Sequence, residues 1–243
     1  MNVPATEPEF VKAADLHKDP RIVSQMFDLV AERYDVTNDV LTAFQQRGWR
    51  RAAATALNAG PDDSVLDIAG GTGSSAIHYI ERGAHVTAAD FSPGMLAKGR
   101  ERHPELEFVY ADAMNLPFDD ASFSATTISF GLRNISDPRR ALAEMYRVTK
   151  PGGRVLVVEF STPPNRLVRG VYLWFLRSVL PILATVTSSD KPAYEYLTDS
   201  IVDWPNQNEL GRMISEAGFV NVRYRNLTLG VVAMHLGFKP ERS

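Results

Sequence analysis

A glycine-rich loop that directly follows a short apolar strand is the feature that most constrains the fold of this chain. The segment reads Val65-Leu66-Asp67-Ile68-Ala69-Gly70-Gly71-Thr72-Gly73, and a helical pattern follows it at Ser74–Arg82. Gly70, Gly71 and Gly73 permit backbone angles and a close ligand approach that a Cβ atom would prevent. The following helix is expected to point its N-terminus, with unpaired N–H groups, at the ligand. The segment therefore predicts the first strand–loop–helix unit of an α/β fold, with a ligand site at the loop.

Strands and helices are expected to alternate from this loop onward. The expected strands are Ser64–Ile68, His85–Ala89, Phe108–Ala111, Phe123–Ser129, Arg154–Phe160, Phe219–Asn226 and Val231–Phe238. The expected helices are Ser74–Arg82, Gly94–Arg102, Arg139–Thr149 and Asn206–Ala217. Short apolar strands that alternate with helices predict a Rossmann-like, doubly wound and mostly parallel sheet of seven strands.

The sequence indicates a single domain. Residues 1–19 are expected to form a flexible tail, and residues 20–243 one domain large enough to bury a substantial core. Within it, residues 61–160 are the expected cofactor-binding core and residues 161–205 a mostly helical insert. Two helices, Ile22–Tyr34 and Thr37–Leu57, are expected before the sheet.

Composition excludes several kinds of chemistry. The chain has no cysteine, which excludes a thiol nucleophile and a cysteine-bound cluster and fits a reducing cytoplasm. A net charge of −3 gives no electrostatic reason to expect a nucleic-acid partner. The most apolar stretch, Leu167–Val186, is interrupted by Arg169, Arg177 and Pro181, so no membrane span is predicted. No metal is predicted either, because metal-ligand spacing is missing at His17, His78, His85 and His103.

Polar side chains stand at the ends of four successive strands. Ligands of an open α/β sheet bind beyond the carboxyl ends of its strands, where the strand order reverses. Asp90 can accept hydrogen bonds from two ribose hydroxyls, and Asp112, which precedes Ala113, can accept one from an adenine amino group. Ser129 is expected beside the first strand. The alternative is that the glycines only make a tight turn and the aspartates cap helices. Three acids at successive strand ends, Asp67, Asp90 and Asp112, favour a ligand instead.

The loop also fits the nicotinamide-binding pattern G-x-G-x-x-A at Gly71–Ala76, although such a match alone is weak evidence. Asp67 separates the two interpretations. A carboxylate that faces the loop suits the ammonium and sulfonium charges of S-adenosyl-L-methionine, whereas it would repel a pyrophosphate by about 3 kcal/mol at ~5 Å. We therefore expect S-adenosyl-L-methionine as the cofactor.

Five motifs extend this interpretation over nearly the whole chain, from about Asp19 to Pro240. The motifs lie at Phe27–Asn38, Asp67–Gly73, Ile128–Asn134, Tyr146–Arg154 and Asn226–His235. They make the sequence resemble the menaquinone/ubiquinone-biosynthesis C-methyltransferases. Many methyltransferases share the glycine loop, but the Ser-Phe-Gly-Leu-Arg-Asn and C-terminal motifs are more specific.

The resemblance implies a class I methyltransferase fold and C-methylation of a prenylated quinol. It carries cofactor contacts onto Thr72, Asp90, Asp112 with Ala113, and Ser129. Some relatives have asparagine where Asp112 stands, and a carboxylate cannot donate a hydrogen bond back to the adenine ring. The short connection between the glycine loop and Asp90, and the run Ser161–Asn165, resemble the menaquinone members, so the expected acceptor is demethylmenaquinol.

Arg133 and Asn134, which follow the fourth strand, are the predicted catalytic residues. Methylation at a ring carbon needs an electron-rich acceptor, so a group that favours loss of a quinol proton is expected. Arg133 can stabilise a developing phenolate and Asn134 can orient it. The alternative is that Arg133 pairs with a carboxylate and Asn134 turns the chain. His235 is a second candidate base, but a histidine within an alternating strand is more often structural.

The apolar insert is expected on the acceptor side. It can form a channel for the isoprenoid tail and contact the membrane from the cytoplasmic side, with Arg166, Arg169 and Arg177 facing anionic headgroups. The alternative is core or a subunit interface of a homodimer, and both interpretations predict that Trp174 is buried. Three other functions remain open: methylation of a ubiquinone precursor, cofactor binding without turnover, and nicotinamide-dependent oxidoreduction.

Overall fold

The computed structural model describes residues 45–179 and 198–241. The predicted tail, the predicted helix Ile22–Tyr34 and part of the insert lie outside these residues. Of the predicted helix Thr37–Leu57, the described part is α3 (Gln45–Leu57). The division of the chain into tail, core and insert therefore stays a prediction.

Seven strands form one sheet in the order β3-β2-β1-β4-β5-β7-β6. The first five pair in parallel, and β7 is antiparallel to both β5 and β6. This arrangement confirms the mostly parallel, doubly wound sheet, and its order reverses between β1 and β4. The strands are β1 (Ser64–Ile68), β2 (His85–Asp90), β3 (Glu107–Tyr110), β4 (Phe123–Ser129), β5 (Thr149–Phe160), β6 (Val220–Leu227) and β7 (Val232–Phe238).

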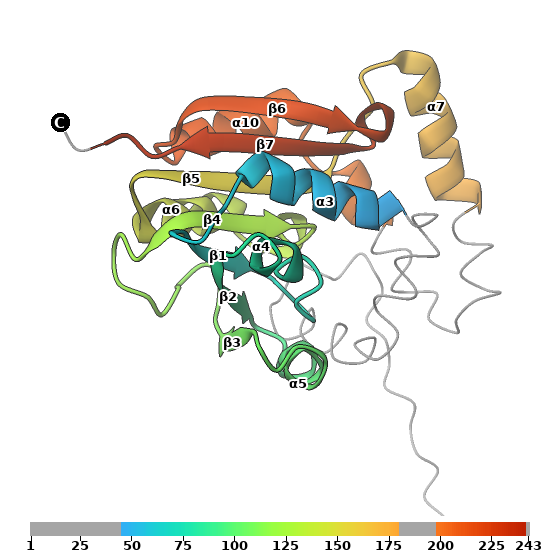
Figure 1. Cartoon of the computed structure of the whole chain (residues 1–243). Coiled ribbons are helices and arrows are strands. Elements are labelled where there is room, and N and C mark those ends of the chain that lie inside the picture. Colours follow the sequence, from blue (N-terminus) through green and yellow to red (C-terminus); the bar gives the residue numbers. More distant parts are fainter. Residues whose placement is uncertain (1–44, 180–197, 242–243) are drawn as a thin grey trace, which may run out of the picture.

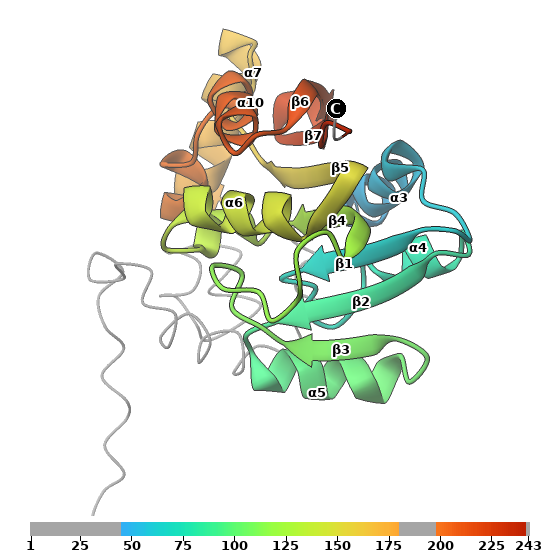
Figure 2. The same ribbon diagram turned by 90° about the vertical axis from the view of Figure 1, so that its left-hand side faces the viewer.

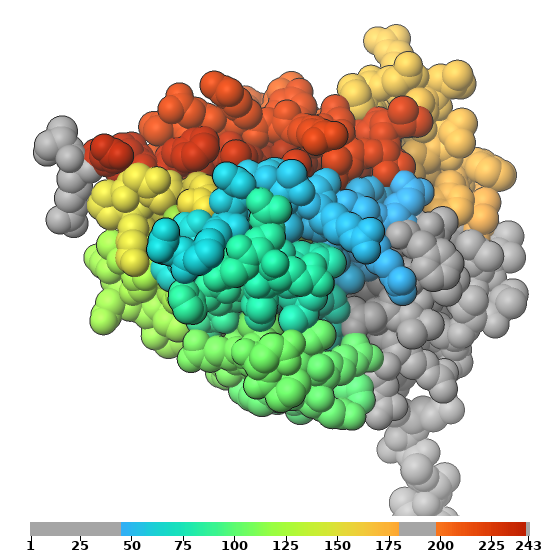
Figure 3. Space-filling model, viewed as in Figure 1, coloured from blue at the N-terminus to red at the C-terminus, as the bar shows by residue number. Residues whose placement is uncertain are grey.

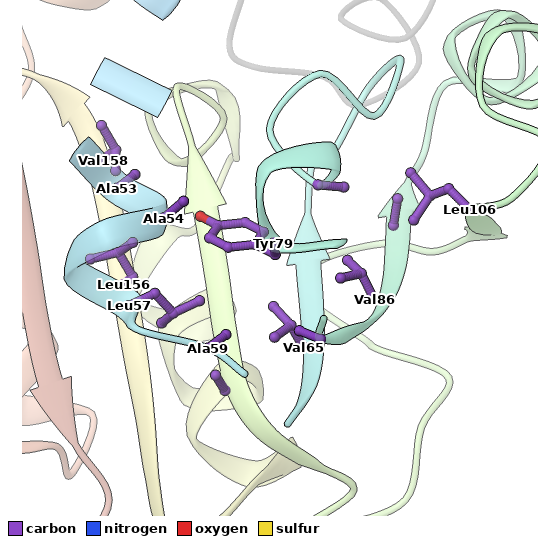
Figure 4. Packing of buried hydrophobic residues seen from close by; sticks show 14 of the residues in the cluster. Ala53, Ala54, Leu57, Ala59, Val65, Tyr79, Val86, Leu106, Leu156 and Val158 are labelled. Atoms are coloured by element: carbon purple, nitrogen blue, oxygen red, sulfur yellow. The ribbon is translucent and has the colours of Figure 1, made fainter. Parts of the chain in front are cut away.

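Helices cover both faces of the sheet (Figures 1 and 2). Side chains of α3, α4 (Ile77–Ile80) and α5 (Pro93–Arg102) belong to one apolar core, and those of α6 (Pro138–Val148) and α10 (Gln207–Glu216) to a second core on the opposite face. Figure 4 shows the first core, in which side chains from α3, β1, β2 and β5 surround Tyr79. Helix starts follow their caps: Ser92 and Asp137 accept from the first turns of α5 and α6, and a Pro follows each cap.

Two local predictions were wrong. The helix expected at Ser74–Arg82 is reduced to the four residues of α4, because the amides of His78 and Tyr79 bond carbonyls three residues back, at Ser75 and Ala76, and residues 74–76 form turns instead of an α-helix. The expected helix N-terminus therefore does not begin at the loop. The strand expected from Arg154 begins at Thr149, since the backbone of Gly152 and Gly153 pairs with Lys239 beyond β7 and extends the ladder through the turn residues.

The described part of the insert contains α7 (Arg166–Trp174) and a π-helical turn, Phe175–Val179. The helix follows the carboxyl end of β5 and projects beyond the β6–β7 edge (Figure 3). The inner side of this segment packs through Tyr172 and Leu176 on Phe160. Trp174 is 61% exposed in the single chain, so it is not part of the core: it lies on the other side of the helix, with Leu167 and Val171.

Candidate functional site

A cavity lies at the carboxyl ends of β1, β2 and β4, where the strand order reverses. Its volume, open mouth included, is about 980 Å³. Most of the predicted cofactor-site residues line it: Gly70, Gly71, Thr72, Asp90, Asp112, Ala113 and Ser129. Asp67 and Gly73 are not among the lining residues.

The loops after β1 and β4 touch each other at the floor of this cavity. A Cβ atom on Gly131 would lie 2.4 Å from the Cβ of Ala69, so only glycine fits there. Ala69 and Phe130 have positive φ angles of 52° and 59°, which non-glycine residues rarely adopt. Strained residues persist where the surrounding structure fixes them, and such positions cluster at binding sites.

Asp67 is the most unusual group at the site. It is 1% exposed, and neither carboxylate oxygen has a hydrogen-bond partner among the described residues. Its Oδ2 lies directly behind Gly70, 3.4 Å from where a Cβ of that glycine would stand. Burial raises the pKa of Asp67 from 3.8 to about 7, while the charge of Arg50 opposes the shift and that of Asp90 adds to it. A buried acid without donors is costly, and a cationic ligand group would stabilise its charged form.

Asp90 holds the glycine loop in place. Its Oδ2 accepts from the amide of Gly71 at 2.8 Å and its Oδ1 from the amide of Ser92 at 2.9 Å. An ionised carboxylate offers about four lone pairs, so it has the capacity to accept from ligand hydroxyls as well. The side chain is 7% exposed and lines the cavity, as the prediction of a ribose contact requires.

The far end of the cavity is formed by the segment after β3. Asp112 is exposed, and its Oδ1 accepts from the amide of Met114 at 2.8 Å. Ala113 lies beside it, and the side chain of Met95 from α5 adds an apolar surface. A flat aromatic base could lie against such a surface with its amino group near Asp112.

Gly73 has a packing role in the fold. It adopts a φ of +84°, which favours glycine, but it does not line the cavity. An added Cβ would lie 2.8 Å from Leu106 and 3.0 Å from Phe108. The glycine therefore lets the loop pack against the side chains around β3, and its predicted contact with the cofactor stays a prediction.

Two cavity residues, Gln46 and Arg50 of α3, were missed by the sequence analysis. Gln46 is 5% exposed, and its Oε1 finds no hydrogen-bond partner in the part of the chain that the structure describes. A position before the first strand gives no local signal that it faces the glycine loop.

Arg133 lies behind the cavity rather than in it. It is 6% exposed and its Nη1 donates to Oε1 of Glu159 at 2.8 Å and to the carbonyl of Phe130. Its guanidinium also lies 5.1 Å from the ring centroid of Phe160. The carboxylate partner that the alternative interpretation required is therefore present. A role of Arg133 at the acceptor stays a prediction.

Asn134 lines the cavity, is 8% exposed, and ends the short 3-10 helix Leu132–Asn134. A second polar group is the hydroxyl of Tyr172 in α7. Burial raises the pKa of this hydroxyl, the charge of Arg133 lowers it, and the charge of Glu159 raises it. The Tyr172 hydroxyl has no partner among the described side chains. Asn134 is among the residues that line the cavity, whereas Tyr172 is not.

His235 does not reach the cavity. It is fully buried in β7, and one ring nitrogen, Nε2, lies 2.8 Å from the carbonyl of Gln207 in α10. Burial lowers the pKa of His235, and the hydrogen bond to Gln207 opposes the shift. These contacts agree with the structural alternative. Among the described residues there is also no group of three acidic or histidine side chains that could hold a metal ion.

Comparison with known proteins places this geometry in a family. The model of the ubiE/COQ5 methyltransferase family matches residues 14–239. This chain belongs to that family. A demethylmenaquinone methyltransferase of Mycobacterium bovis is 53% identical over 227 residues, covering 93% of this chain and 96% of the relative. One of Beutenbergia cavernae is 52% identical over 222 residues, covering 91% and 92%.

The chain also has the class I methyltransferase fold that the sequence predicts. The solved structure of a SAM-dependent methyltransferase from Thermotoga maritima superposes with a TM-score of 0.65 at 21% identity, covering 88% of this chain and 99% of that one. The resemblance read from the five motifs and the predicted fold class are both confirmed. In the described ranges, 45–179 and 198–241, no helix is long and apolar enough to cross a membrane.

Proposed function

We propose that this chain transfers the methyl group of S-adenosyl-L-methionine to a ring carbon of demethylmenaquinol, giving menaquinol. The acceptor rests on one observation: relatives 52% and 53% identical over more than nine-tenths of the chain are demethylmenaquinone methyltransferases. The cofactor is that of the family, and the residues of the cavity fit it.

The fit to the cofactor rests on charge and hydrogen bonding. Asp67 supplies a buried carboxylate that has no hydrogen-bond donor among the described residues, which suits an ammonium group. Asp90 faces the cavity and can accept from the ribose hydroxyls, and Asp112 lies where an adenine amino group can reach it. A dinucleotide would place its pyrophosphate at the same loop, against the charge of Asp67, so nicotinamide chemistry is disfavoured.

When bound, S-adenosyl-L-methionine supplies an electrophilic methyl group on a sulfonium leaving group. The task of the chain is to align the acceptor and exclude water, and good alignment alone contributes roughly 7–11 kcal/mol. Asn134 would bind a quinol hydroxyl at the mouth of the cavity. Arg133, fixed by Glu159, would act on the same hydroxyl only through the electrostatic field or a water, because its guanidinium is already paired.

We also propose that α7 contacts the cytoplasmic surface of the membrane that holds the prenylated acceptor. Leu167, Val171 and Trp174 are 79%, 59% and 61% exposed and recur at helical spacing on one side of the helix. Residues 161–189 contain Arg166, Arg169 and Arg177 but no acidic residue. An apolar stripe beside basic side chains is typical of helices that lie in the interface of an anionic bilayer.

Vesicle co-sedimentation tests this contact. Trp174→Ser should weaken binding to vesicles with anionic lipid, and neutral vesicles should bind the wild type poorly. If vesicles do not bind but Trp174→Ser converts a dimer to a monomer in light scattering, α7 is a subunit interface and the membrane proposal fails.

A methyl-transfer assay tests the reaction itself. The purified protein is incubated with radiolabelled S-adenosyl-L-methionine and either demethylmenaquinol or a demethylated ubiquinone precursor carrying the same tail. We expect label mainly in the menaquinol product. Preferential labelling of the ubiquinone precursor would contradict the acceptor, and tight cofactor binding with no transfer to either would favour a non-catalytic role.

A further inference from the structure

α3 presents two polar side chains to the glycine loop from outside the sheet. Gln46 and Arg50 are four residues apart, so they lie on the same face of the helix, and both line the cavity. Arg47 and Arg51 are exposed on other sides of α3. The helix is held over the site by Trp49, whose Nε1 donates to Oγ1 of Thr228 at 2.9 Å.

Two buried groups, Gln46 in the lining of the cavity and Asp67 directly behind Gly70, offer acceptors that match the donors of an ammonium group. Both oxygens of Asp67 and the Oε1 of Gln46 have no partner among the described residues, although both side chains are at least 95% buried. An unsatisfied buried acceptor is costly and rare in native proteins. An ammonium has three N–H donors and no acceptor, so one such group could satisfy these atoms together.

Arg50 adds the opposite charge. Its guanidinium is close enough to Asp67 to influence its ionisation and lines the same cavity. Asp90 lines the cavity as Arg50 does, and its charge also acts on Asp67. A ligand that is only cationic would be repelled by Arg50, and one that is only anionic would be repelled by the two acids. A group that carries both charges on neighbouring atoms fits.

We propose that Gln46 and Arg50 of α3, together with Asp67, form a binding site for the α-amino acid end of the cofactor. Gln46 accepts from the ammonium, and Arg50 donates to the carboxylate. The inference rests on the use of S-adenosyl-L-methionine under the proposed function. It makes α3 the element that selects ligands with an intact amino acid end over other thioadenosines.

Isothermal titration calorimetry with two probes tests this site without relying on activity. S-adenosylhomocysteine carries the amino acid end, and 5′-methylthioadenosine lacks it. For the wild type we expect the first to bind at least ~100-fold more tightly. Arg50→Met should weaken S-adenosylhomocysteine about 10- to 100-fold, the range for a hydrogen bond to a charged group, and leave methylthioadenosine within about twofold.

Gln46→Leu should weaken S-adenosylhomocysteine about tenfold, again without effect on methylthioadenosine. Arg51→Met is the matched control, since it removes the same charge from an exposed position on α3 and should change neither affinity. Arg50→Lys keeps the charge and should give an intermediate loss, which separates the contact from a folding defect.

Each other outcome is informative. Equal weakening of both probes by Arg50→Met would overturn the proposal, because Arg50 would then only shape the cavity, and unchanged affinities would overturn it as well. A wild type that binds S-adenosylhomocysteine tightly but no better than methylthioadenosine contradicts this inference and leaves the proposed function intact. A wild type that binds neither probe contradicts the proposed function itself.

Discussion

Replacement of Asp67 by asparagine should stabilise the ligand-free protein while it weakens cofactor binding. Burial raises the pKa of Asp67 from 3.8 to about 7. The shift of about three units costs the ionised folded state about 4 kcal/mol, at ~1.4 kcal/mol per unit. The cost is absent below pH 4. It grows between pH 4 and pH 7, because in that interval Asp67 is ionised only in the unfolded state, and it is constant above pH 7. The substituted amide remains neutral at every pH and escapes this cost.

The assay is urea unfolding of both proteins at pH 5.5 and pH 8.5. The free-energy advantage of Asp67→Asn should grow by about 2 kcal/mol between these two values, as follows from a pKa near 7. Affinity for S-adenosylhomocysteine should fall at the same time, since a neutral amide loses the charge attraction to the ammonium. A variant that is less stable than the wild type by the same amount at both pH values would refute the reasoning.

Asp63 provides the control. It is an aspartate that is only partly buried, in contrast to Asp67. Its burial raises the pKa, but hydrogen bonds from Arg154, Ser124 and Gly60 outweigh this effect and lower the pKa to about 2. A lowered pKa adds stability that is fully present above pH 4 and is lost as the pH falls toward 2. Asp63→Asn should therefore destabilise the protein equally at pH 5.5 and 8.5, in contrast to Asp67→Asn.

Three further substitutions probe the surroundings of the cavity. Gly131→Ala should lower the free energy of unfolding by about 1–3 kcal/mol through overpacking against Ala69, and Ala69→Gly in the same chain should recover part of the loss in urea unfolding; no recovery would show that the two loops do not touch. Arg133→Met should cost about 3–5 kcal/mol because it leaves Glu159 charged and buried, whereas the double variant Arg133→Met/Glu159→Leu should regain stability; methyl-transfer activity that returns with it would show that Arg133 has no role at the acceptor. Tyr172→Phe should leave the melting temperature within ~2 °C, since its hydroxyl has no partner among the described residues, and any role in binding the acceptor should appear as a raised KM for the quinol with an unchanged affinity for the cofactor.

The sheet and the cofactor end of the cavity could be predicted because their signals are local. Apolar strands, the glycine loop and an acid at each strand end lie within a few residues of one another in sequence. Asp90 and Asp112 line the cavity for that reason. Gly73 shows the limit of the local signal: its positive φ was expected, but whether a ligand or a side chain fills the space beside it depends on β3.

What the sequence did not reveal depends on contacts between distant segments. Nothing in the sequence near Gln46 and Arg50 indicates that α3 lines the same cavity as the loop at residues 69–72. The partner of Arg133 was expected in kind, but Glu159 stands at the end of another strand. Trp174 was predicted buried because it is apolar, and its exposure follows from the position of α7 beyond the edge of the sheet, which no periodicity encodes.

The central claim is that the chain methylates a ring carbon of a quinol. The most direct test is a reaction with S-adenosyl-L-methionine carrying a ¹³C-labelled methyl group and demethylmenaquinol, followed by NMR of the isolated product. The account predicts one labelled methyl group with the chemical shift of a methyl on an aromatic carbon. A labelled methoxy signal would show that oxygen is the acceptor, and an unlabelled quinol recovered after full cofactor binding would contradict the account altogether.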